Sequence, residues 1–138
     1  MSMEQLALKP IIRKYLGIPY RHGGRDLNGL DCLGLIHLFY RDCGITVPDG
    51  DGKAYDTQWV LDDPERYLRG LQQVGREVPL YDLKPLDLVY FRLLGYISHG
   101  GIMVDPYRFI HVMQHQRVHL TPLTAPWRRQ LAGARRLL

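Results

Sequence analysis

Apolar residues recur every three or four positions over residues 3–16, which predicts an amphipathic helix that Gly17 ends. Pro10 is expected to bend or restart this helix, because proline lacks the N–H that a helix interior uses. Residues 18–30 form a glycine-rich stretch that is typical of a loop. A second helix is predicted over residues 31–42, and its few polar positions indicate that it is buried.

The second half of the chain changes from helical spacing to short β-prone runs. Two short helices are predicted first, at residues 55–61 and 64–73. Helices followed by an antiparallel meander indicate an α+β fold, in which the N-terminal helices pack on a central antiparallel sheet. A length of 138 residues fits one domain, spanning 1–138. The predicted strands lie at residues 86–91, 97–105, 108–113, 117–120 and 134–138, and a turn is predicted at 105–107.

The composition is that of an ordinary globular protein, with 46% hydrophobic and 23% charged residues. A net charge of +4 suits an anionic polymer such as cell wall or nucleic acid. The arginines near the C-terminus are expected on a solvated surface. No aromatic residues alternate with them, so no nucleic-acid partner is expected. No stretch has the length of a membrane span, and residues 1–10 lack the pattern of a signal peptide.

The two cysteines, Cys32 and Cys43, differ in their expected chemistry. On a helix they lie about 16 Å apart, which is too far for a disulfide, and neither belongs to a CxxC zinc motif. Asp31 is a good N-cap, so Cys32 is predicted in the first helical turn, where the helix dipole and free N–H groups stabilise a thiolate. The same N–H groups are suited to a developing oxyanion. The alternative is that Cys32 is a buried, inert cysteine.

Two histidines are the candidate partners of Cys32. His99 lies in a predicted strand between Ser98 and Gly100, and it is a candidate general base. His111 lies in the next predicted strand, where a hairpin would bring the two imidazoles together. His111 would then hold His99 in its productive tautomer. The alternative for each histidine is a structural residue bonded to the backbone.

A metal-binding protein is a second hypothesis. His111, His115 and His119 are spaced by four, which places them on one face of a continuous helix or strand. Residues 114–116 look like a turn, however, and a turn would break that alignment. A calcium loop at residues 49–52 is not supported, because the next two positions lack the ligand and the glycine that such a loop needs.

Five motifs in chain order resemble those of the NlpC/p60 family of papain-like cell-wall peptidases. Ser-His-Gly-Gly-Ile at residues 98–102 is similar to the family's Ser-His-Val-Gly-Ile, and Asp-Cys-Leu-Gly-Leu at residues 31–35 is similar to its Asp-Cys-Ser-Gly-Leu. Together they span most of the chain. They are Gly-Ile-Pro-Tyr-Arg-His-Gly-Gly (17–24), Asp-Cys-Leu-Gly-Leu (31–35), Leu-Lys-Pro-Leu-Asp-Leu-Val-Tyr-Phe (83–91), Ser-His-Gly-Gly-Ile (98–102) and Phe-Ile-His-Val (109–112).

The resemblance implies a papain-like fold with the nucleophile at a helix N-terminus, and a catalytic triad of Cys32, His99 and His111. It implies hydrolysis of peptidoglycan stem peptides, commonly after γ-D-glutamate, without a metal or another cofactor. The remaining motif residues are expected to shape the oxyanion and substrate pocket. They are Tyr20, His22, Asp31, Leu33, Ser98 and Gly100.

Departures from the family pattern bear on how the site differs. Leu33 replaces a serine, which bears on substrate choice, and Leu86 replaces a glycine. An alternative function is a catalytically inactive module of the same fold that binds cell wall or a phage-tail protein. A chain without a signal peptide resembles hydrolases carried on phage tails or phage-like particles, or delivered as effectors; export with a trimmed signal is the other possibility.

Overall fold

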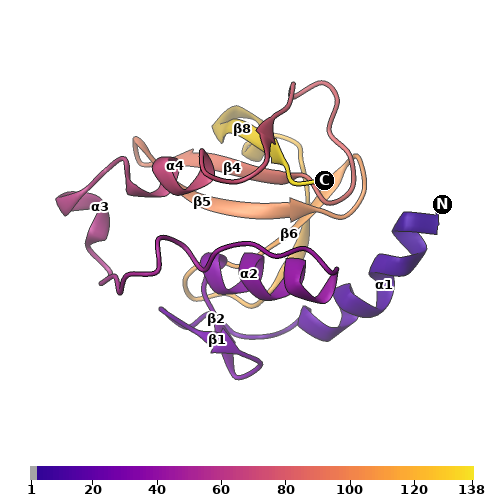
Figure 1. The fold of residues 1–138 in the computed structure, drawn as a ribbon, viewed down its shortest axis with the longest axis horizontal. Helices are drawn as coiled ribbons and strands as arrows, with labels where there is room; N and C mark the ends of the chain where they lie inside the picture. Colours follow the sequence, from indigo (N-terminus) through magenta and orange to yellow (C-terminus); the bar gives the residue numbers. More distant parts are fainter. Residues whose placement is uncertain (1–2) are drawn as a thin grey trace.

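Six antiparallel strands form the centre of the protein in a computed structural model that describes residues 3–138 (Figure 1). Met1 and Ser2 lie outside the described residues. The strand order is β3-β8-β4-β5-β6-β7, so the last strand of the chain lies between the first and second strands of this sheet. The strands are β3 (Arg76–Glu77), β4 (Leu88–Leu93), β5 (Tyr96–Met103), β6 (Arg108–His111), β7 (His119–Pro122) and β8 (Leu131–Arg136).

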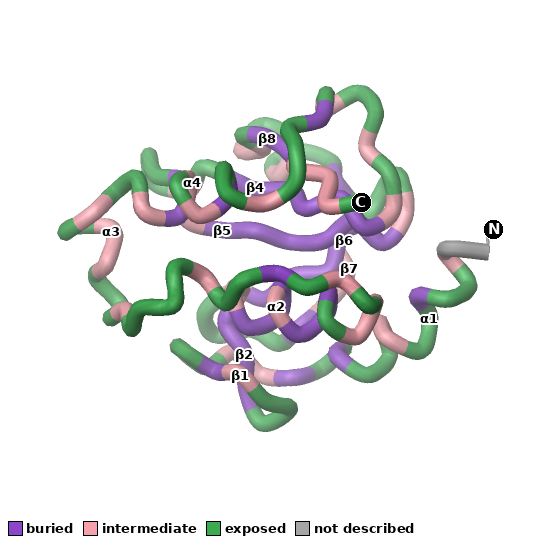
Figure 2. Tube along the Cα trace, viewed as in Figure 1, coloured by how far each residue is buried: buried purple, intermediate pink, exposed green. Residues whose placement is uncertain are grey.

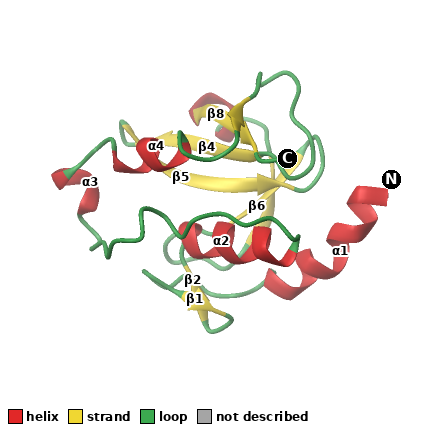
Figure 3. Cartoon of the chain, in the orientation of Figure 1, coloured by secondary structure: helices red, strands yellow, loops and turns green. Residues whose placement is uncertain are grey.

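Helix α2 lies on one face of this sheet, and α1 adjoins the far end of α2 (Figure 3). A two-stranded ladder, β1 with β2, precedes α2 and lies beside it. No helix within residues 3–138 has both the length and the apolar character needed to cross a bilayer. The bounds are α1 (Met3–Tyr15), β1 (Arg25–Asp26), β2 (Gly29–Leu30), α2 (Cys32–Asp42), α3 (Trp59–Asp62), α4 (Arg66–Leu71) and α5 (Trp127–Gln130).

The predicted α+β class and the order of the main elements are confirmed. Helix α1 continues through Pro10, so the expected restart there is wrong. The final strand, β8, begins before the predicted residues 134–138, and the two short helices are shorter than predicted. Strands β1, β2 and β3 were not predicted, because two residues are too few to show an alternating pattern.

The central strands and α2 carry most of the buried residues (Figure 2). These residues form two apolar clusters, one on each face of the sheet, that hold the elements together. Successive residues of β4 belong to opposite clusters, as the alternation of a strand requires. Leu88 packs in the cluster that contains the buried face of α2, whereas Val89 and Phe91 pack with Trp127 of α5 in the other. The sheet is therefore covered on both faces, and the predicted burial of α2 is confirmed.

A buried ion pair joins the start of β4 to the end of β8. Asp87 is 1% exposed, and both its carboxylate oxygens accept hydrogen bonds from Arg136 at 2.8 Å. The neighbouring Arg135 bonds Glu77 and two backbone carbonyls. The prediction of a solvated surface is therefore wrong for Arg135 and Arg136, whose side chains are only 12% and 14% exposed. It is confirmed for Arg128 and Arg129, which are exposed.

Leu86 shows why its position is usually a glycine in the family that the motifs resemble. Its φ is +74°, in the left-handed region that costs a side chain roughly 1–2 kcal/mol. The leucine side chain is nevertheless buried in the cluster beneath α2, and its carbonyl accepts a hydrogen bond from Tyr40 at 2.7 Å. Burial of the side chain thus offsets the backbone strain.

Replacing Leu86 by glycine is expected to lower the free energy of unfolding by roughly 1–3 kcal/mol, because truncating a buried leucine costs more than the strain it relieves. Urea unfolding measures this difference. Leu94 is the matched control, since its φ is +52° and its side chain is 98% exposed. Leu94→Gly should be no less stable than wild type. A Leu86→Gly protein more stable than wild type would contradict this account.

Candidate active site

The carboxylate of Asp31 organises the start of α2. Asp31 is 4% exposed, and its Oδ1 accepts a hydrogen bond from the backbone N–H of Gly34 at 2.9 Å, which confirms the predicted N-cap. Its Oδ2 accepts the N–H of Gly23 at 2.9 Å and the hydroxyl of Tyr55. Arg25 donates to Oδ1 at 2.8 Å. One carboxylate thus ties the helix start to two loops.

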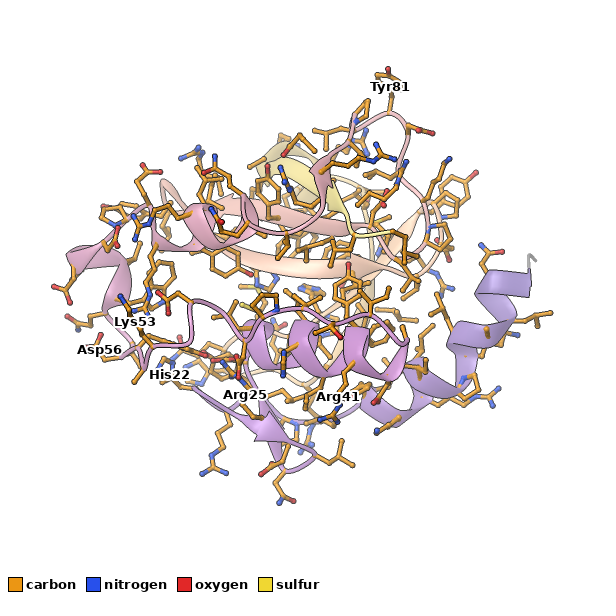
Figure 4. The ribbon with its side chains drawn as sticks, in the orientation of Figure 1. His22, Arg25, Arg41, Lys53, Asp56 and Tyr81 are labelled. Carbon is orange, nitrogen blue, oxygen red and sulfur yellow. The ribbon has the colours of Figure 1, made fainter. Side chains whose placement is uncertain are left out.

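Arg25 extends this network outward from Asp31. Its remaining N–H groups reach Asp49 at 2.9 Å and the Tyr55 hydroxyl at 2.8 Å. Burial works against the charge of Arg25, but the hydrogen bond to Tyr55 and the nearby Asp31 raise its pKa, so the guanidinium stays charged. Figure 4 shows Arg25 and His22 near the N-terminal end of α2. Neither Arg25 nor Tyr55 was singled out from the sequence.

Close packing at the first turn of α2 explains why the motif at residues 31–35 contains Gly34. A Cβ atom at Gly34 would lie 2.1 Å from the carbonyl oxygen of Gly24. No side chain fits between the helix and the glycine-rich loop at this point. The loop is therefore held directly against the turn that carries Cys32.

The Cys32 thiol lies between α2, α4 and β5. Its Sγ is 3.6 Å from the hydroxyl of Tyr67, and the backbone N–H of Gly100 also bonds the sulfur. Cys32 is a half-buried free thiol, as is Cys43, which caps the opposite end of α2. Among the described residues, Tyr67 is the one whose side chain hydrogen-bonds the Cys32 sulfur. The Cys32 sulfur makes no hydrogen bond to His99 there.

The two histidines predicted to meet across neighbouring strands do so. His99 Nε2 lies 2.8 Å from Nδ1 of His111, and both side chains are buried. The other nitrogen of His111, Nε2, is 2.8 Å from the hydroxyl oxygen of Thr121 on β7. The predicted proximity is confirmed, and Thr121 is a third member of this chain of bonds that the sequence did not single out.

The second nitrogen of His99 is left free of the histidine pair. His99 Nδ1 has no hydrogen-bond partner within residues 3–138, yet no buried side-chain nitrogen or oxygen there lacks one. Nδ1 therefore reaches solvent. Because His111 occupies Nε2, Nδ1 is the position at which His99 can take up a proton from another group.

Burial keeps the thiol and the imidazole neutral in the resting protein. It raises the pKa of Cys32 to about 11, helped by the negative charge of Asp31, while Tyr67 and Gly100 lower it. Burial also lowers the pKa of His99 to about 4. This direction runs against the resting thiolate predicted at the helix start, because loss of solvent at the sulfur opposes the effect of the helix dipole.

The other motif residues surround the thiol in different ways. Burial raises the pKa of the Tyr20 hydroxyl, and the nearby negative charges of Asp31 and Cys32 raise it further. His22 instead bonds the backbone carbonyl of Tyr55 at 3.0 Å, so it supports the loop. Ser98 is half-buried on β5, one residue before His99.

A cavity of about 1060 Å³ opens beside the thiol-bearing turn. Leu33, which follows Cys32, lines it together with Tyr55 and Tyr67. Ile36 and Leu71 extend its apolar wall. The position at which the motif usually carries a serine hydroxyl thus presents a hydrocarbon surface to this cavity.

The arrangement does not support the metal hypothesis. His119 faces His111 across β6 and β7, with ring centroids 4.6 Å apart. His115 lies in the turn between those strands and is exposed, as the turn prediction required. Within residues 3–138, no group of three His, Cys, Asp or Glu side chains is placed to hold a metal ion.

Comparison with protein families settles the relationship of the chain. The NlpC/P60 family pattern matches residues 17–136. The chain belongs to the NlpC/P60 family. A γ-DL-glutamyl hydrolase of Bacillus subtilis (strain 168) is 32% identical over 128 residues, a match that covers 89% of this chain and 27% of that protein.

Further NlpC/P60 relatives agree. The murein DD-endopeptidase MepS/murein LD-carboxypeptidase of Escherichia coli (strain K12) is 28% identical over 88% of this chain and 57% of its own length. The chain thus spans 27% and 57% of these two curated relatives. The crystal structure of an NlpC/P60 family protein from Bacillus cereus superimposes with a TM-score of 0.73 at 27% identity, covering 97% of this chain and 40% of that one. The predicted papain-like NlpC/P60 fold is confirmed.

Removing the Asp31 carboxylate should destabilise this NlpC/P60 chain. Asp31→Ala leaves Arg25 and two backbone N–H groups without their acceptor, so the free energy of unfolding is expected to fall by roughly 3–5 kcal/mol. Urea unfolding measures the loss. Asp63→Ala is the matched control, because its pair with Arg69 is exposed; its unfolding midpoint should hardly change. Equal effects of the two substitutions would contradict the central role of Asp31.

Alkylation of Cys32 should depend steeply on pH. In a Cys43→Ser background, the rate with iodoacetamide is expected to rise about tenfold per pH unit from pH 7 toward 11, since the thiolate fraction grows below the pKa of about 11. Stopped-time mass spectrometry of the alkylated protein gives the rate. A fast rate that is flat below pH 8 would instead show a resting thiolate–imidazolium pair.

Proposed function

We propose that this chain is a cysteine peptidase that hydrolyses peptide bonds in peptidoglycan stem peptides, with Cys32 as nucleophile, His99 as general base and acid, and His111 as the residue that orients His99. The observation that carries the proposal is the buried His99–His111 hydrogen bond on β5 and β6, in a chain whose Cys32 begins α2, the helix that packs on β5. The activities of the two curated relatives, a γ-DL-glutamyl hydrolase and a murein endopeptidase/carboxypeptidase, support the same chemistry.

The mechanism begins from a neutral pair. His111 binds Nε2 of His99, so the thiol proton passes to Nδ1 as the sulfur attacks the substrate carbonyl carbon. The backbone N–H of Cys32 and the hydroxyl of Tyr20 stabilise the oxyanion. His99 then gives the proton to the leaving amine, and water hydrolyses the acyl-enzyme with His99 again taking a proton.

Thr121 extends the chain of hydrogen bonds behind His99. His111 can hold the Nε2 of His99 only if its own Nδ1 has the complementary donor or acceptor role. The Thr121 hydroxyl at 2.8 Å can adopt either role toward His111 Nε2, so it supports whichever tautomer the relay needs. Thr121 is thus a positioning residue that acts through His111.

The finer substrate assignment is the bond between γ-D-glutamate and the following diamino acid. Leu33 places an apolar wall where the family motif has a serine, so this subsite favours a hydrocarbon portion of the stem over a group that needs a hydroxyl partner. Association with a phage tail or phage-like particle stays a prediction.

Digestion of purified peptidoglycan tests the proposal. The wild-type chain should release peptides with new amino-terminal diamino acids, and Cys32→Ala should reduce this release by about three orders of magnitude or more. Mass analysis of soluble fragments from diaminopimelate- and lysine-type peptidoglycan identifies the bond. Cys43→Ala is the matched control and should digest normally, because Cys43 lies at the opposite end of α2.

Identical fragment profiles for wild type and Cys32→Ala would contradict the peptidase. Sedimentation with insoluble peptidoglycan then decides the alternative. A folded chain that pellets with peptidoglycan but releases no fragments would be the inactive binding module.

A further inference from the structure

The side chain that hydrogen-bonds the proposed nucleophile comes from a part of the chain outside the five motifs. Tyr67 lies on α4, between α2 and the sheet, and its hydroxyl is 3.6 Å from Cys32 Sγ. Within residues 3–138, the Cys32 sulfur is the hydrogen-bond partner of this hydroxyl. Since Tyr67 is only 7% exposed, it has little access to water as an alternative partner.

The ring of Tyr67 is held in this orientation by its neighbours. Trp59 of α3 stacks on it with ring centroids 6.2 Å apart and planes 24° apart. Tyr67 and Trp59 both line the cavity beside Leu33. The phenol therefore stands between the cavity and the sulfur, with its hydroxyl toward the reacting atom.

Gly100 makes the room that this hydroxyl occupies. A Cβ atom at Gly100 would lie 2.6 Å from the Tyr67 hydroxyl oxygen, which is closer than side-chain atoms approach. The backbone N–H of the same Gly100 bonds the sulfur. The absence of a side chain at residue 100 thus permits two hydrogen-bonding groups to converge on Cys32 Sγ.

We propose that Tyr67 is a further catalytic residue, whose hydroxyl donates a hydrogen bond to the Cys32 sulfur as its proton leaves, and that Gly100 is required to admit that hydroxyl. In the resting state the thiol can donate to the phenol oxygen. Once the proton has gone to His99, the sulfur is an acceptor only, so the phenol must donate. A hydrogen bond to a charged sulfur is stronger than one to a neutral thiol, which favours the ionised state.

The protonation of Tyr67 is compatible with this role. Burial, together with the adjacent Cys32, raises the pKa of the phenol well above its usual value. Tyr67 therefore keeps its proton near neutral pH and can act as a donor. The role rests on the proposed function for its catalytic meaning, but the hydrogen bond itself is measurable without substrate.

The test measures alkylation of Cys32 at pH 8 in the full chain carrying Cys43→Ser. Tyr67→Phe keeps the ring and its stacking but removes the hydroxyl, and the rate with iodoacetamide is expected to fall about tenfold or more. Tyr90→Phe is the matched control, because its hydroxyl bonds Glu77 and not the thiol; its rate should equal that of the parent. An unchanged or faster rate for Tyr67→Phe overturns the proposal.

A second variant separates loss of the hydrogen bond from general disturbance. Gly100→Ala should slow alkylation like Tyr67→Phe, and in the Tyr67→Phe background it should add little, because the clashing oxygen is gone. Fully additive effects would contradict the requirement for Gly100. Failure of the parent chain to digest peptidoglycan, with these alkylation results intact, would reject the proposed function alone.

Discussion

The site depends on one buried carboxylate. Asp31 caps α2, holds the glycine-rich loop through Gly23 and forms an ion pair with Arg25. A carboxylate this deeply buried is tolerated only when it is fully paired, so the partners must arrive together. The position of Cys32 is therefore fixed by the same bonds that fix the loop and Tyr55. Structure and chemistry share this constraint, and a looser helix start would misplace the sulfur as well.

What the sequence could predict follows from the range of its signals. The apolar run of α2 and its Asp31 cap are local, so both were found. The meeting of His99 and His111 needed only the pairing of adjacent strands. Arg25 and Tyr67 were missed, because their contacts with Asp31 and Cys32 come from loops and short helices whose placement leaves no local pattern.

The charge state of Cys32 is where the site departs from the sequence prediction, and burial explains why. A helix start does favour a thiolate, but only where the sulfur keeps contact with water. The Cys32 sulfur instead contacts α4 and β5, and burial is the largest cause that moves the thiol and His99 toward their neutral forms. The burial of Cys32 cannot be predicted from the capping residue that precedes it. It depends on where α4 lies, and α4 comes from a later part of the chain.

Departures from the family motif acquire reasons once the packing is known. Leu86 accepts a left-handed backbone because its side chain is buried. Gly100 stands where the motif has valine, and its missing side chain leaves space that the Tyr67 hydroxyl fills. A neutral resting thiol needs help to ionise at the moment of attack. The Tyr67 hydroxyl, a neutral donor beside the sulfur, supplies that help without burying a further charge. The burial of the thiol and the missing side chain at Gly100 therefore serve the same chemistry.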